Sequence, residues 1–127
     1  KILVEVSVGE LLDKISILEI KKEKIKDPEK LNFINNELVI LRGQLDQNVK
    51  SDSKLKNLFK SLKEINAKLW VIEDDKRMCE KDKDFAEKFI KLSRDVHFLN
   101  DDRAKIKLDI NNHTGSKIKE IKEYTNY

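Results

Sequence analysis

The residues of this chain that are best placed to do chemistry are polar side chains that interrupt apolar helical stripes. Arg103 is the clearest case, because it stands between Leu99 and Ile106 at heptad spacing. A guanidinium on such a stripe needs a carboxylate or phosphate partner, since an unpaired buried charge costs several kcal/mol. Only four of the 27 basic residues are arginine. An arginine retained among so many lysines indicates that a planar, bidentate donor is required.

Further polar residues share helical faces with Arg103 or lie near the start of the first expected helix. They make up the candidate ligand-binding residues Glu10, Asp13, Lys14, Glu73, Arg77, Asn100, Arg103 and Lys107. The favoured interpretation is a buried salt-bridge network that fixes the register of a leucine-rich bundle. The other is a pocket for an anionic small molecule, such as a nucleotide or sugar phosphate, lined by Arg and Lys and oriented by carboxylates.

A catalytic set is incomplete in this sequence. All-α nucleoside-triphosphate pyrophosphohydrolases hold magnesium with paired E-x-x-E and E-x-x-D motifs, of which Glu10 and Asp13 match one half. The second half fails, because Lys76 stands three residues after Glu73, and too few carboxylates converge. One cysteine and two histidines cannot assemble a Cys/His zinc site. We therefore predict no metal and no cofactor, and keep magnesium-dependent phosphoryl processing as an alternative.

Composition indicates an all-α fold. Charged residues make up 40% and hydrophobic residues 39%, with three Gly and one Pro, which is too few turn-forming residues for a sandwich or barrel. The net charge of +3 arises from interleaved signs, as on solvated helices, and not from the one-signed stripe of a nucleic-acid binder. No apolar run approaches the ~20 residues that span a bilayer. The single cysteine fits a reducing compartment, so we expect a cytoplasmic protein that binds neither membranes nor nucleic acid.

Capping signals divide the chain into helices. Ser7 and Glu10 have the spacing of a capping box and start a helix expected over 8–26. Asp27-Pro28 stops that helix and starts the next, and residues 48–53 form a loop that ends in a cap. Asp84 is expected to cap the fourth helix. Gly115 ends it and Ser116 caps a last short helix from Lys117 to about Tyr124; the same Thr114-Gly115-Ser116 segment is a weaker candidate for a phosphate cradle.

Heptad seams predict how these helices pack. The first two seams are Leu11, Ile15, Leu18, Lys22 and Ile25, then Leu31, Ile34, Leu38, Leu41 and Leu45. Similar seams run along the third and fourth helices. The sequence therefore predicts one domain over residues 1–127: an antiparallel bundle of two long helical hairpins with coiled-coil-like packing. A short N-terminal extended segment over residues 2–6 and a short C-terminal helix complete it.

Four blocks of sequence resemble those of a family of small uncharacterised bacterial and phage proteins. The blocks are VSVGELLDK from Val6, LWVIED from Leu69, NDDRA from Asn100 and TGS from Thr114. The resemblance covers nearly the whole chain and implies no reaction. It implies that Glu19 and the eight candidate residues belong to one shared feature. The family pattern tends to carry a basic residue where Asp102 stands here, which argues against a strictly electropositive pocket.

The leading functional hypothesis is a non-enzymatic helical module that self-associates, as a dimer, or presents helix faces to a protein partner. Its basis is the length of the seams and the incomplete catalytic set. Small-anion binding or phosphoryl processing at the Arg103 patch is the alternative hypothesis.

Overall fold

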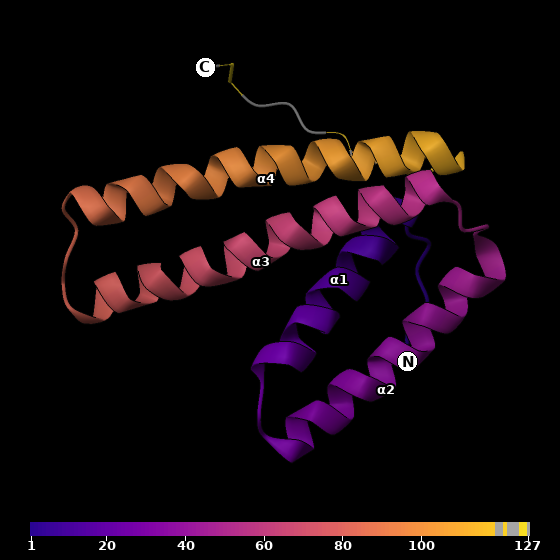
Figure 1. Cartoon of the computed structure of the whole chain (residues 1–127), viewed down its shortest axis with the longest axis horizontal. Helices are drawn as coiled ribbons and strands as arrows, with labels where there is room; N and C mark the ends of the chain where they lie inside the picture. Colours follow the sequence, from indigo (N-terminus) through magenta and orange to yellow (C-terminus); the bar gives the residue numbers. More distant parts are fainter. Residues whose placement is uncertain (119–120, 122–124, 127) are drawn as a thin grey trace.

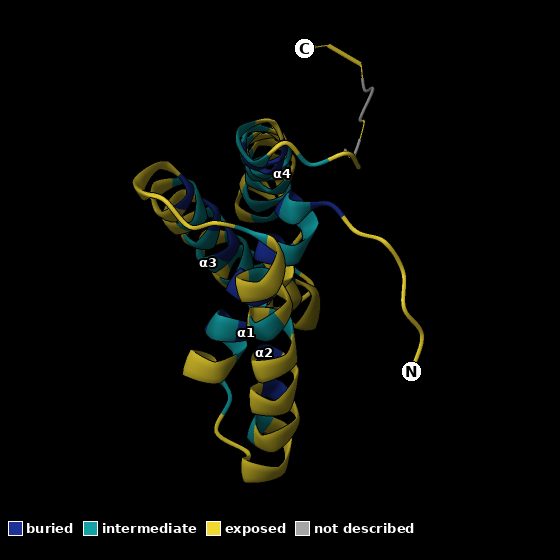
Figure 2. Ribbon diagram, turned by 90° about the vertical axis from the view of Figure 1, so that its right-hand side faces the viewer, coloured by how far each residue is buried: buried dark blue, intermediate teal, exposed yellow. Residues whose placement is uncertain are grey.

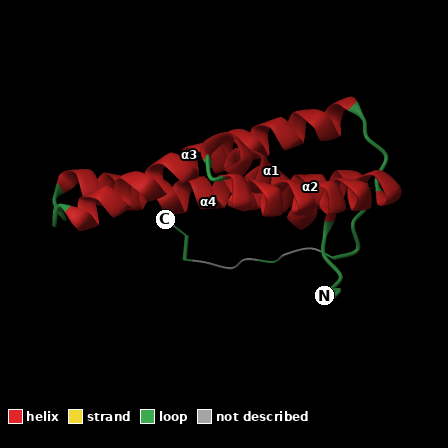
Figure 3. Ribbon diagram, turned by 90° about the horizontal axis from the view of Figure 1, so that it is seen from below, coloured by secondary structure: helices red, strands yellow, loops and turns green. Residues whose placement is uncertain are grey.

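The computed structural model describes residues 1–118, 121 and 125–126. Over these residues the chain forms four α-helices and no strand (Figures 1 and 3). The helices are α1 (Val8–Lys24), α2 (Pro28–Asn48), α3 (Ser53–Lys81) and α4 (Glu87–Thr114). The all-α prediction is confirmed, and α1 ends two residues before the predicted Lys26.

Side-chain caps start the first three helices. Ser7 Oγ accepts the Glu10 N–H at 3.0 Å, and Asp27 accepts the Lys30 N–H at 2.9 Å with Pro28 in the first turn. Asp52 accepts the Leu55 N–H at 2.8 Å and so caps α3. Each cap satisfies one of the backbone donors that a helix start leaves without an intrahelical acceptor.

The predicted cap of α4 was wrong. Asp84 accepts the nearby Ala86 N–H at 3.1 Å, and α4 begins only at Glu87 without a side-chain cap. The reason is that Asp84 closes the turn that follows α3, where its own N–H donates to the Cys79 carbonyl at 2.8 Å. Lys83 turns the chain there with a positive φ of 55°.

The end of α4 agrees with the sequence only as far as the glycine. Gly115 adopts a left-handed conformation with φ 69°, which glycine takes without steric penalty. A C-terminal helix is not present at the described residues Lys117, Ile118 and Ile121, and residues 119–120 and 122–124 of that expected helix lie outside the described residues. At the other end, Ile2, Leu3 and Val4 are non-helical and 74–91% exposed.

Helix α1 is the centre of the packing, because it alone contacts all three other helices. Helix α2 contacts α1 only, whereas α3 and α4 pack against each other and against α1. The core is built from buried side chains of all four helices: Leu12, Ile15, Leu18, Ile34, Leu38, Leu55, Leu62 and Ile110. Figure 1 shows that α3 and α4 run side by side far beyond the end that α1 and α2 cover.

Candidate functional site

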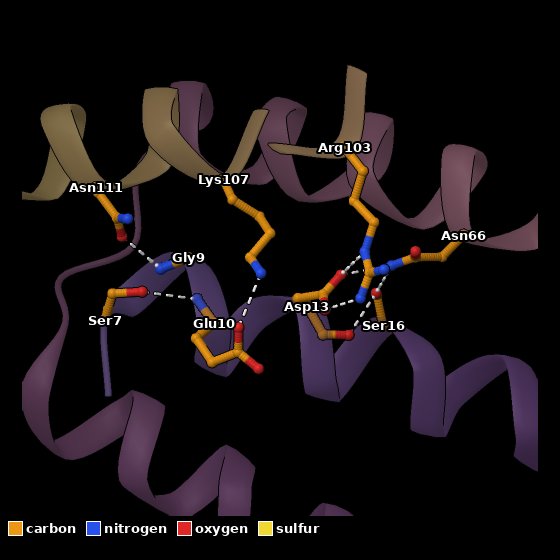
Figure 4. A network of polar contacts seen from close by, with 9 residues as sticks. All are labelled: Ser7, Gly9, Glu10, Asp13, Ser16, Asn66, Arg103, Lys107 and Asn111. Atoms are coloured by element: carbon orange, nitrogen blue, oxygen red, sulfur yellow. Dashed lines mark hydrogen bonds and ion pairs between the residues drawn. The ribbon is translucent and has the colours of Figure 1, made fainter. Parts of the chain in front are cut away.

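Candidate residues of α1 and α4 meet in a polar layer between these two helices (Figure 4). Arg103 Nε donates to Asp13 Oδ1 at 2.9 Å, and its Nη2 donates to Asp13 Oδ2. The Asp13 side chain is only 2% exposed, against 29% for Arg103. The bidentate geometry matches a planar guanidinium to a carboxylate. The structure thus supplies the carboxylate that the position of Arg103 on its apolar stripe requires.

Helix α3 completes the surroundings of the buried carboxylate. Asn66 Nδ2 donates to Asp13 Oδ1 at 2.9 Å and to Ser16 Oγ at 2.7 Å. The Ser16 hydroxyl donates to the Asp13 backbone carbonyl at 2.8 Å. In the described part of the chain, no buried side-chain nitrogen or oxygen lacks a hydrogen-bond partner. Ser16 and Asn66 are not among the candidate residues predicted from the sequence, although a serine on the buried face of α1, three residues after Asp13, is a usable signal.

Asp13 is ionised in this setting. Burial alone raises the pKa of its carboxyl. The hydrogen bonds from Arg103 and Asn66 and the positive charges of Arg103 and Lys107 outweigh that effect, so the pKa of Asp13 lies below its ordinary value. The contact with Arg103 is therefore a true ion pair and not a neutral hydrogen bond.

A second ion pair lies one turn away. Lys107 Nζ contacts Glu10 Oε2 at 2.8 Å, with the lysine side chain 10% exposed. Glu10 therefore faces α4 with its carboxylate, while its backbone N–H bonds to Ser7. Two acidic residues of α1 thus oppose two basic residues of α4, and the layer is balanced in charge.

The N-terminus of α1 is closed by residues from the end of α4. The Gly9 N–H donates to Asn111 Oδ1 at 2.7 Å, and the Val8 N–H donates to Ser116 Oγ at 3.3 Å. Ser116 was predicted to cap a helix that follows it, but it contributes to the cap of α1 instead. The Thr114 hydroxyl donates to the Ile110 carbonyl at 2.8 Å. The backbone N–H groups of Gly115 and Ser116, which a phosphate cradle would need to be free, both donate to the Asn111 carbonyl.

Gly9 allows α1 and α4 to approach closely. A Cβ atom at this position would lie 2.6 Å from the Lys107 carbonyl oxygen and 3.0 Å from Asn111 Oδ1. Backbone atoms cannot move aside as a flexible side chain can, so any larger residue must separate the helices. The glycine thereby sets the distance across which the two ion pairs form.

The remaining candidate residues lie outside this layer. Glu73 and Arg77 are exposed on α3 and line an open groove of about 390 Å³ together with Trp70 and Arg103. Lys14 is exposed on α1, and Asn100 is half-buried on α4 outside the residues that line this groove.

Glu19, which the resemblance grouped with them, belongs to a separate cluster. It contacts Arg42 at 3.3 Å and Lys63 at 3.1 Å, and Lys63 also contacts Glu23 at 2.9 Å. Bonds to Glu23 and Glu19 raise the pKa of Lys63.

Two further observations bear on the site's chemistry. Within the described residues, no group of three or more His, Cys, Asp or Glu side chains is arranged to hold a metal ion. No helix of the described chain has the length and apolar character needed to cross a membrane.

Comparison with known proteins identifies a family but no activity. Residues 2–127 match the model of a family of unknown function, DUF6165. No curated protein and no solved structure matches the chain.

Replacing one member of the buried ion pair should destabilise the fold. We expect Arg103→Met to lower the free energy of unfolding by about 3–5 kcal/mol, because it leaves a buried carboxylate without its counter-charge. The double variant Asp13→Leu/Arg103→Met should recover most of that loss, since it removes both charges. Urea unfolding measures both values. A single variant as stable as the unchanged protein would show that the pair does not hold α4 to α1.

The close approach at Gly9 predicts a second stability effect. Gly9→Ala should destabilise the protein by about 1–3 kcal/mol, because the added methyl group overlaps the Lys107 carbonyl. Lys14→Ala, at an exposed position of the same helix, is the matched control and should stay within about 0.5 kcal/mol. Thermal unfolding of the two variants tests this, and equal melting temperatures would contradict it.

Proposed function

We propose that this chain, which belongs to that family of unknown function, is a non-enzymatic helical module that presents helix faces to protein partners. The observation that carries the proposal is a set of large exposed apolar side chains between residues 67 and 99, which are the second half of α3, the turn after it and the first half of α4. These residues are called the distal half below. Its exposed apolar residues are Val71, Met78, Phe85, Ile90 and Phe98, between 39% and 55% exposed.

Two of these side chains, Val71 and Phe98, line a groove between α3 and α4. The groove has a volume of about 620 Å³ and is lined by Ala67, Lys68, Val71, Ile72, Asp95, Phe98 and Leu99. Single exposed apolar residues are ordinary, but neighbouring ones along a groove are typical of interaction sites. Charged residues at the margin, such as Lys68 and Asp95, resemble the polar rim of an interface. Figure 2, which looks along α3 and α4, shows exposed and half-buried segments on both helices.

The polar layer supports the same proposal indirectly. Arg103 and Lys107 are matched by Asp13 and Glu10, so their charges stabilise the bundle. Continuation of the α3–α4 seam as a coiled coil, with a partner helix in the groove, is the packing that the heptad pattern favours.

Charged substitutions in the distal half should abolish binding without unfolding the protein. We expect Val71→Glu and Phe98→Glu to reduce the yield of cross-linked partner at least tenfold, because each places a carboxylate in an apolar contact. Asn57→Glu adds the same charge at an exposed position of α3 outside the distal half and is the matched control. A photo-reactive residue at position 72, with cross-links identified by mass spectrometry, provides the measurement. Unchanged cross-links in both groove variants would contradict the proposal.

Small-anion binding is the second candidate, and the groove beside Trp70 is the observation in its favour. Its volume of about 390 Å³ lies in the range of ligand sites, and Arg77 and Arg103 contribute to its lining. Glu73 and Asp74 line the same groove, however, and their carboxylates oppose an anion.

We therefore expect no rise in melting temperature with nucleotides or sugar phosphates, with or without Mg²⁺. A bound ligand stabilises the folded state in proportion to the logarithm of its concentration. A concentration-dependent rise that Arg77→Met abolishes would establish the second candidate in place of the first.

A further inference from the structure

We propose that a second copy of this chain docks, antiparallel, on the outer face of α2, and this inference rests on the proposed function. The outer face is defined by residues at alternating spacings of four and three: Glu29, Phe33, Asn36, Ile40, Gly43 and Gln47. Such spacing forms one continuous stripe on a helix.

The outer face lies opposite the seam by which α2 joins the bundle. Its inner seam carries the buried Ile34 and Leu38 and packs on α1, the only helix that α2 contacts. Figures 1 and 2 show α2 at the edge of the molecule, with its outward side exposed along most of its length. A second helix therefore has unobstructed access to this face.

The outer face carries large apolar side chains that are exposed to solvent. Phe33 is 69%, Ile40 64% and the flanking Val39 72% exposed, and these are the most exposed large apolar side chains of the four helices. A helix that needed only one partner would place polar residues at these positions. The pattern indicates that α2 is covered on two sides.

The shape of the face favours a second copy over an unrelated protein. In an antiparallel pair with its two-fold axis at the level of Leu38, Phe33 lies opposite Gly43 of the second copy, and Ile40 lies opposite its Asn36. A Cβ atom built on Gly43 meets no other atom within 4 Å. Phe33, the largest side chain of the stripe, therefore faces the open space at Gly43 of the second copy. Val39 meets Val39 of the second copy beside the axis. Such self-matching is what a two-fold interface requires.

The paired stretch, residues 29–47, is about 28 Å long at 1.5 Å per residue. A single helix pair of this length lies near the lower end of specific interfaces, about 1,200 Å² in total. We therefore expect a dimer that forms and dissociates with protein concentration.

The test combines sedimentation at several concentrations with two variants of α2. Gly43→Leu should raise the dimer dissociation constant at least tenfold, because the new side chain fills the gap for Phe33. The same change favours the isolated helix, so melting of the dilute monomer should not fall, which separates lost docking from lost folding. Phe33→Glu should also weaken the dimer, whereas Phe98→Glu, in the distal half, should leave it intact.

Disulfide trapping tests the orientation. A mixture of Phe33→Cys and Gly43→Cys chains should form a mixed disulfide, since these positions are opposite each other. A dimer of either variant alone should form no disulfide. The substituted cysteines of its two copies lie about 15 Å apart along the helix axis. The native Cys79 is 3% exposed and does not compete.

Three results would overturn the inference: a monomer at every concentration, a dimer insensitive to both α2 variants, or disulfides within each single variant, which indicate a parallel pair. The proposed function is judged separately, by the cross-links at the distal half. A dimer broken by Phe98→Glu alone would refute docking on α2 while supporting that function.

Discussion

The buried carboxylate of Asp13 is the constraint on which the rest of the structure depends. A charge that is 2% exposed is tolerated only with a counter-charge and hydrogen bonds at the same place. Arg103 of α4 provides the counter-charge, and Asn66 of α3 provides a further hydrogen bond. The Asp13 carboxylate therefore specifies the level at which three helices meet. Leucine seams alone would allow the helices to shift by a heptad with little change in apolar contact. The ion pair excludes those alternatives.

This arrangement divides the molecule into two kinds of surface. Around α1, acidic and basic residues face each other and satisfy one another. Away from α1, the distal half of α3 and α4 and the outer face of α2 leave large apolar side chains in contact with solvent. Four of the polar residues that first suggest chemistry, Glu10, Asp13, Arg103 and Lys107, are thus engaged in holding the fold. The surfaces proposed for binding are the apolar ones.

The helices were predictable because their signals are local. Asp27-Pro28 and Gly115 act within one turn of themselves, and heptad spacing is read along a single helix. Arg103 could also be recognised, since its position on an apolar stripe demands a partner. Its pairing with Asp13 could not be derived, because it depends on where α1 crosses α4. The prediction that Asp84 caps α4 was wrong, because the Asp84 N–H bonds to the end of the preceding helix, α3. Ser116 shows the same limit: its residue type indicates that it accepts a backbone hydrogen bond but not from which helix.

The cap of α1 has a consequence for the order of folding. The backbone N–H groups of Val8 and Gly9 donate to side-chain oxygens that lie 108 and 102 positions later in the chain. During synthesis, α1 therefore leaves the ribosome with two backbone groups that only water can satisfy until the last turn of α4 has emerged. Such long-range contacts slow folding, because a large loop must close before they form. The hydrogen bonds that complete the first turn of α1 can therefore form only after the end of α4 and Ser116 have been synthesised, although α1 lies at the centre of the bundle.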